Sequence, residues 1–129
     1  MLKALNTLST QQAKPTERTL SHVVRFINYA ASHPDAQVQF RASDMVLHIL
    51  SDASYLNETD ARSTAAGKFF LNGHPRSAQD PSPSHDNGAV NVLCSIIKVV
   101  VASAAEAEAG SLFFNCQEGV PIRTCLEYL

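Results

Sequence analysis

Three acidic side chains have the residue types and settings that could do chemistry. Asp52 lies in the string SDASYL, directly after the most apolar segment of the chain, MVLHIL at Met45–Leu50. Glu106 and Glu108 lie in a later stretch that is rich in helix formers. A carboxylate at a strand end and one on a helix converge when that helix packs across the sheet, and together they bind Mg²⁺ or Mn²⁺ through oxygen ligands. The three acids are therefore candidate metal ligands.

Ordinary structural roles compete with this interpretation. Asp52 also suits a turn or the cap of a short helix, and glutamates on helix surfaces are common. At about 100° per residue, Glu106 and Glu108 face in nearly opposite directions, on either side of a bulkier apolar surface centred near Ala105, Leu112 and Cys116. At most one glutamate then meets Asp52, and periodicity does not decide which.

The elements that would position these acids follow from hydrophobic patterning. Strands are predicted at Met45–Leu50, with Asp52 at the exit before a turn at Asn57–Asp60, then at Thr64–Leu71 and Ala89–Val101. Residues 37–41 form a short strand or an extended lead-in. Three successive strands with no helix between them imply an antiparallel meander. Residues 72–88, rich in Pro and Gly, predict a long, mobile loop.

Helices are predicted on both sides of the strands. Thr16–Ser32 places apolar residues on one helical face, at Leu20, Val23, Val24, Ile27 and Ala31, with Thr16 as N-cap. A second helix begins after Ser103, whose capping box includes Glu106. It is expected to stop near Gly119, and Pro121 is expected to start another.

Composition favours one soluble, intracellular domain, either cytoplasmic or nuclear. The chain has 129 residues and 45% hydrophobic content, with no run approaching about 18 apolar residues and no secretory signal at its start. Residues 1–43 carry a formal charge of +3 and residues 44–129 carry −5. No basic stripe typical of a self-sufficient nucleic-acid binder is present.

Other reactive side chains have ordinary explanations. Three cysteines form no CxxC pair and are expected to be buried free thiols: Cys94, Cys116 and Cys125. His48 could be a ligand, but a strand histidine that faces a second layer or solvent is favoured. Phe113 and Phe114 could stack on bases, although packing is their more common role.

The ordered set of motifs resembles a known family. SDASYL, then ARSTAAGKFFL with its Arg62-Ser63 pair, then SAAEAE before an apolar helix are similar to the ribonuclease H region at the C-terminal end of copia-type long-terminal-repeat retrotransposon polyproteins. The resemblance covers roughly residues 11–129 and includes Ser43-Asp44-Met45. The earlier helix resembles the connector that follows the reverse transcriptase in such polyproteins. The domains would then be a connector at 1–43 and a truncated ribonuclease H-like domain at 44–129.

The resemblance implies a nuclease that uses Mg²⁺ or Mn²⁺ to hydrolyse the RNA strand of an RNA–DNA hybrid. Asp52 matches the first catalytic acid and Glu108 matches the glutamate of the first helix, both as metal ligands, while Glu106 matches the capping residue. The family uses further acids from a fourth strand and a later helix, and parallel strands four and five would be missing here. Asp44, Asp60, Asp80 and Asp86 match neither of these acids.

The expected fold is therefore α+β: a partial ribonuclease H-like fold with an N-terminal helix, a three-stranded antiparallel meander, and one or two helices. The leading hypothesis is a fragment with an incomplete two-acid site at Asp52 and Glu108, inactive alone. Without a fourth strand, Met45–Leu50 becomes an exposed edge, which predicts self-association or poor solubility. The alternatives are a non-catalytic module that uses this edge to bind a partner protein, and a nuclease whose missing acids come from a second chain.

Overall fold

The computed structural model describes residues 1–73 and 86–129 of the chain. These residues contain three α-helices and a three-stranded antiparallel sheet, which makes the protein an α+β protein. Two compact units are present, Met1–Gln37 and Val38–Leu129. Residues 38–43 thus belong with the sheet, whereas the sequence grouped them with the connector.

The first unit consists of α1 (Leu2–Thr10) and α2 (Glu17–Ala31). The prediction of α2 is confirmed: Thr16 is its N-cap, and its hydroxyl accepts from the Thr19 amide in a reciprocal capping box. The sequence did not predict α1. The apolar face of α2 is largely exposed at Leu20, Val24 and Ile27, whereas Thr19 is buried.

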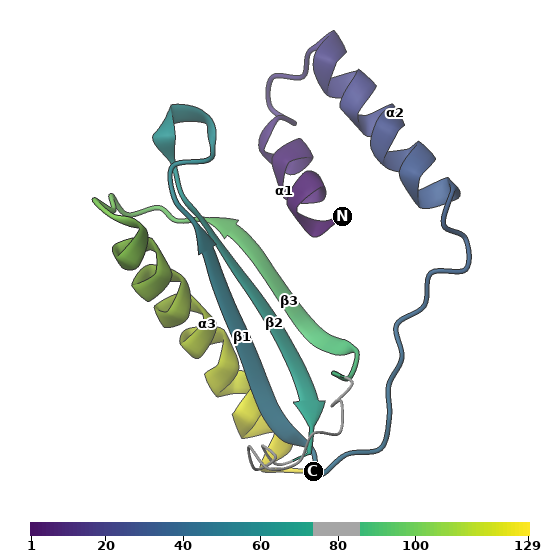
Figure 1. The fold of residues 1–129 in the computed structure, drawn as a ribbon, viewed down its shortest axis with the longest axis vertical. Helices are drawn as coiled ribbons and strands as arrows, with labels where there is room; N and C mark the ends of the chain where they lie inside the picture. Colours follow the sequence, from purple (N-terminus) through teal and green to yellow (C-terminus); the bar gives the residue numbers. More distant parts are fainter. Residues whose placement is uncertain (74–85) are drawn as a thin grey trace. The chain divides into compact units, whose positions relative to one another are not determined.

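The second unit is built on β1 (Val46–Ser54), β2 (Thr64–Asn72) and β3 (Ala89–Ile96). They pair in the order β1-β2-β3, antiparallel throughout, as Figure 1 shows, so the predicted meander is confirmed. Leu50, Lys68 and Val92 form one row across the three strands. The Lys68 ammonium lies 4.6 Å from the centroid of the Phe70 ring and 3.3 Å from an Asp86 carboxylate oxygen.

Two strand ends differ from the prediction because pairing decides them. β1 continues past Leu50 to Ser54, since β2 keeps pairing as far as Thr64, which is opposite Ser54. Asp52 therefore lies inside the strand and is not at its exit. β3 ends at Ile96, opposite Thr64 at the start of β2, and one further backbone hydrogen bond joins the Ile97 amide to the Ser63 carbonyl at 2.8 Å. The β-branched run continues beyond the sheet, where Val100 is 98% exposed.

One long helix, α3 (Ala104–Leu126), follows the sheet and lies along one of its faces, against β1 and β2 (Figure 1). It does not stop near Gly119, and Pro121 lies inside it, which corrects the expected two helices. The buried side is a stripe of small residues four apart: Ala107, Ser111, Asn115 and Gly119. The bulkier side predicted to pack is exposed, with Leu112 at 53%. Small side chains bring the helix closer to the sheet than Leu112 would allow.

Residues 38–43 run into β1 as an extended lead-in without strand pairing of their own. Buried Asn87 holds this segment: its side-chain oxygen accepts from the Arg41 amide, and its side-chain nitrogen donates to the carbonyls of Arg41 and Leu71. The Gly88 amide also donates to the Gln39 carbonyl at 2.7 Å. Of the predicted loop at 72–88, residue 72 ends β2 and residues 74–85 lie outside the described residues.

Candidate functional site

Asp52 is the third residue from the end of β1 and lies opposite Ala66 of β2. Its neighbour Ser51 faces α3, because the Ser51 hydroxyl donates to the Ser111 hydroxyl at 3.2 Å. Side chains alternate between the two faces of a strand, so the Asp52 carboxylate is directed to the face that α3 does not cover. The side chain is exposed. The acid is therefore held by rigid backbone and open to solvent.

The backbone of Asp52, however, is fastened to α3. Its carbonyl oxygen accepts from the Ser111 hydroxyl at 2.6 Å. Asn115, one turn later, donates from its side-chain nitrogen to the Ser51 hydroxyl at 2.8 Å and to the Ala66 carbonyl at 2.9 Å. Sequence reasoning missed Ser111 and Asn115, although the four-residue spacing of small and polar residues was a signal of close packing.

Geometry separates the two glutamates of α3. With about 100° between successive residues, Glu108 lies about 60° from Ser111 around the helix, and Glu106 about 140°. Glu108 is also only about 20° from the line of Gly119, and Gly119 packs directly against Ile49 of β1. Glu108 therefore lies on the flank of α3 that faces β1, one turn before Ser111, while Glu106 lies on the side away from the sheet.

Glu106 instead completes the start of α3. The Ser103 hydroxyl accepts from the Glu106 amide at 3.2 Å, and the Glu106 carboxylate accepts from the Ala102 amide at 2.8 Å. The capping role expected of the pair is confirmed, with Ala102 rather than Ser103 as the backbone donor. An acid in the first turn also stabilises the positive end of the helix dipole.

Asp52 and Glu108 thus belong to the same edge of the sheet but approach it from opposite faces. Carboxylate oxygens suit Mg²⁺ and Mn²⁺, and Mg²⁺ commonly keeps most of its water while bound by one or two carboxylates. Within residues 1–73 and 86–129, no group of three or more His, Cys, Asp or Glu side chains lies close enough to hold a metal ion. The described residues therefore do not supply the oxygen ligands of a two-ion centre.

The other candidate residues either pack against neighbouring side chains or are exposed. His48 is on the same face as Asp52, where its ring stacks on Phe70 and its Nε2 donates to the Gly73 carbonyl at 2.9 Å. Phe114 packs beside the core cluster, and Phe113 is 59% exposed. The expectation of buried thiols was wrong for Cys116 and Cys125, which are both exposed on α3.

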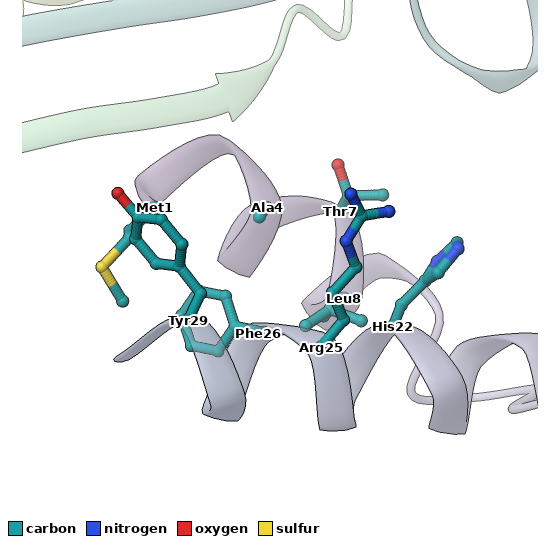
Figure 2. Close-up of a pocket in the computed structure, with 8 residues that line it drawn as sticks. All are labelled: Met1, Ala4, Thr7, Leu8, His22, Arg25, Phe26 and Tyr29. Atoms are coloured by element: carbon teal, nitrogen blue, oxygen red, sulfur yellow. The ribbon is translucent and has the colours of Figure 1, made fainter. Parts of the chain in front are cut away.

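A cavity of about 400 Å³ lies between α1 and α2. Figure 2 shows its lining, in which Phe26 and Tyr29 of α2 lie near Met1, and Arg25 extends toward Thr7. Its lining includes none of the acids singled out by the sequence. No helix in the described ranges is long and apolar enough to cross a membrane.

Comparisons with known proteins add no relative. No protein-family model, curated protein or solved structure matches the chain. The architecture and the acids at the β1 edge are therefore the grounds on which function is argued.

Proposed function

We propose that this chain is a ribonuclease H-like unit of a copia-type retrotransposon polyprotein, which contributes two acids to a metal-dependent nuclease site and does not hydrolyse hybrids alone. Asp52 on the first strand and Glu108 on the following helix are its metal ligands. The substrate class of the complete site is the RNA strand of an RNA–DNA hybrid. Mg²⁺ or Mn²⁺, when bound, polarises a phosphate oxygen and lowers the proton affinity of bound water.

One observation carries the proposal: the Ser111 hydroxyl bonds the Asp52 carbonyl at 2.6 Å. This contact joins the acid-bearing strand to the helix one turn after Glu108, so the relative position of the two elements is fixed by direct hydrogen bonds. The same helix flank packs against β1 through Gly119 and Ile49. Asp52 near the end of β1 and Glu108 on the β1 flank of α3 support the match to the strand acid and the helix acid of the resemblance.

The number of ligands supports the absence of activity in the isolated chain. Two carboxylates at one edge hold a hydrated divalent ion weakly, because the ion keeps its waters and few protein oxygens replace them. In-line displacement at a phosphodiester uses two ions about 3.5–4 Å apart. The described residues supply too few oxygen ligands for that pair.

The test combines a cleavage assay with Mn²⁺ titration followed by NMR. An end-labelled RNA–DNA hybrid stays intact with the chain and Mg²⁺ or Mn²⁺, while substoichiometric Mn²⁺ broadens the amide signals of Asp52 and Glu108 before others. Glu108→Gln and Asp52→Asn each reduce this broadening at least several-fold. Broadening centred elsewhere, or hybrid cleavage that depends on Asp52, contradicts the proposal.

Glu106→Gln is the matched control, since it removes the same charge from the same helix two residues away. It leaves the Mn²⁺ broadening near Asp52 unchanged, because Glu106 faces away from the sheet and caps the helix. If Glu106→Gln and Glu108→Gln reduced the Mn²⁺ broadening equally, the broadening would depend only on the net charge of the helix. That result would contradict a specific site at Glu108.

A further inference from the structure

Among the described residues, β1 pairs only with β2, so its other side is a free strand edge. The edge is nine residues long, and the backbone takes a left-handed conformation just outside each end, at Met45 (φ 57) and Leu56 (φ 53). Such an edge presents unpaired N–H and C=O groups that another strand can pair with. Leu50, at its centre, is 53% exposed.

We propose that the occupant of this edge is β1 of a second copy of the same chain, paired antiparallel about a two-fold axis at Leu50. This register pairs all nine residues of β1, from Val46 opposite the partner's Ser54 to Ser54 opposite the partner's Val46. It places His48 opposite the partner's Asp52, twice by symmetry, and Leu50 opposite the partner's Leu50. The three-stranded sheet of each copy is then continuous with that of the other, and both α3 helices cover the same face.

Neighbouring registers lose this complementarity. A shift of two residues in either direction leaves part of β1 unpaired and sets Asp52 opposite an aliphatic side chain, Val46 or Leu50. A shift of four in one direction places Asp52 opposite the partner's Asp52, where like charges directly across an antiparallel pair are destabilising. The Leu50 register alone combines full length, opposite polarity and an apolar centre.

His48 lies on the exposed face of β1. Its ring stacks on Phe70 with the ring centroids 5.3 Å apart, and its Nε2 donates to the Gly73 carbonyl at 2.9 Å, so Nδ1 is the ring nitrogen available to the partner's Asp52. The Asp52 carboxylate is on the same exposed face of β1, so this register sets a basic side chain opposite an acidic one.

Sedimentation velocity over a range of concentrations tests the proposal in the complete chain. Wild-type protein forms dimers, and Leu50→Glu weakens dimerisation at least tenfold because two glutamates then meet at the axis. Val92→Glu is the matched control: Leu50 and Val92 have similar exposure, and both lie beside Lys68, on opposite edges of the sheet. It leaves dimerisation unchanged. Circular dichroism confirms that both variants are folded.

A cross-link fixes the register independently of those variants. In a background in which Cys94, Cys116 and Cys125 are replaced by Ser, Leu50→Cys forms an intermolecular disulfide in oxidised glutathione, and Val92→Cys does not. A wild-type chain that is monomeric at all concentrations, or equal association of Leu50→Glu and Val92→Glu, overturns the proposal. It does not depend on nuclease activity, so a failed hybrid or Mn²⁺ assay leaves it standing.

Discussion

The side-chain oxygen of Asn115 occupies the space that a Cβ atom at position 67 would need. Asn115 is fully buried, its nitrogen donates to Ser51 and Ala66, and its oxygen has no hydrogen-bond partner among the described residues. Gly67 thus lets the Asn115 side chain lie against the backbone of β2.

The first prediction concerns Gly67 and Asn115 together. Gly67→Ala lowers the free energy of unfolding by about 1–3 kcal/mol, the usual cost of adding a methyl group to a filled interior. Asn115→Ala destabilises the protein separately, because it removes the hydrogen bonds that Asn115 donates. It also empties the space that a Cβ atom at position 67 would occupy. In the Asn115→Ala background, Gly67→Ala therefore costs much less. Urea unfolding of the four proteins in this double-mutant cycle measures the coupling, and simple additivity would contradict the contact.

The second prediction concerns the hydrogen bond from Ser111 to the Asp52 carbonyl. Ser111→Ala lowers the free energy of unfolding by about 1–3 kcal/mol, because it removes a donor from a buried contact. Thr124→Ala is the control on the same helix: its hydroxyl bonds the Val120 carbonyl at an exposed position, and its effect stays within about 0.5 kcal/mol. Equal effects in urea unfolding would show that the buried contact contributes nothing special.

The third prediction concerns Gly119, which the sequence suggested as a helix end. At a C-terminal cap, the effect of a Gly→Ala change depends on the backbone conformation. At an open position in a helix interior, the same change raises the free energy of unfolding by about 1 kcal/mol, because alanine has the higher helix propensity. In this structure the added methyl group meets the Cδ1 atom of Ile49, which has to move, so Gly119→Ala loses this gain. Ile49→Val shortens that side chain and should reduce the loss. A stabilised Gly119→Ala variant in thermal unfolding would show that the helix is not held this tightly.

The fourth prediction concerns Pro121, which lies inside α3 and is exposed. Proline lacks the amide hydrogen that the helix uses and costs about 3 kcal/mol relative to alanine in a helix interior. Pro121→Ala is therefore expected to raise the free energy of unfolding by about 1–3 kcal/mol. An unchanged stability, measured by chemical denaturation, would indicate that α3 is already interrupted at this residue.

The fifth prediction concerns the start of α3. Ser103→Ala removes the hydroxyl that accepts from the Glu106 amide and costs about 1 kcal/mol, whereas Ser103→Gly costs only a few tenths. Far-ultraviolet circular dichroism during thermal unfolding measures both. If the alanine and glycine variants were equal to the wild type, the capping contact would have no energetic role.

The sequence was sufficient for the order of the strands, for α2 and for the cap of α3, because alternation, apolar spacing and Ser103 are local signals. It did not identify the packed side of α3. That side is determined by where β2 has a glycine, and the contact between Gly67 and Asn115 joins residues far apart in the chain. Strand lengths were missed for a similar reason, since the end of β3 at Ile96 depends on its pairing with Thr64, which is far away in the sequence.

For the candidate site, sequence reasoning singled out Asp52 and Glu108 and left the choice between the glutamates to the family resemblance. The structure adds that Glu108, and not Glu106, is on the helix flank toward β1. The sequence did not predict that the Asp52 carbonyl is hydrogen-bonded to α3 while the Asp52 carboxylate lies on the face of the sheet that α3 does not cover. The strand alternation that determines this depends on which neighbour, Ser51, meets the helix.

The segment that leads into β1 can be fastened only after Asn87 has been synthesised. The backbone of Arg41 exchanges hydrogen bonds with a side chain 46 residues further along, and the links from Asp52 and Ser51 to α3 span 59 and 64 residues. Contacts of such separation form slowly, because long loops must close first. The two N-terminal helices depend on local contacts, and β1 can pair with β2 as soon as the next strand is made. The contacts that fasten the start of β1 to Asn87 and its end to α3 form only after most of the chain has been synthesised.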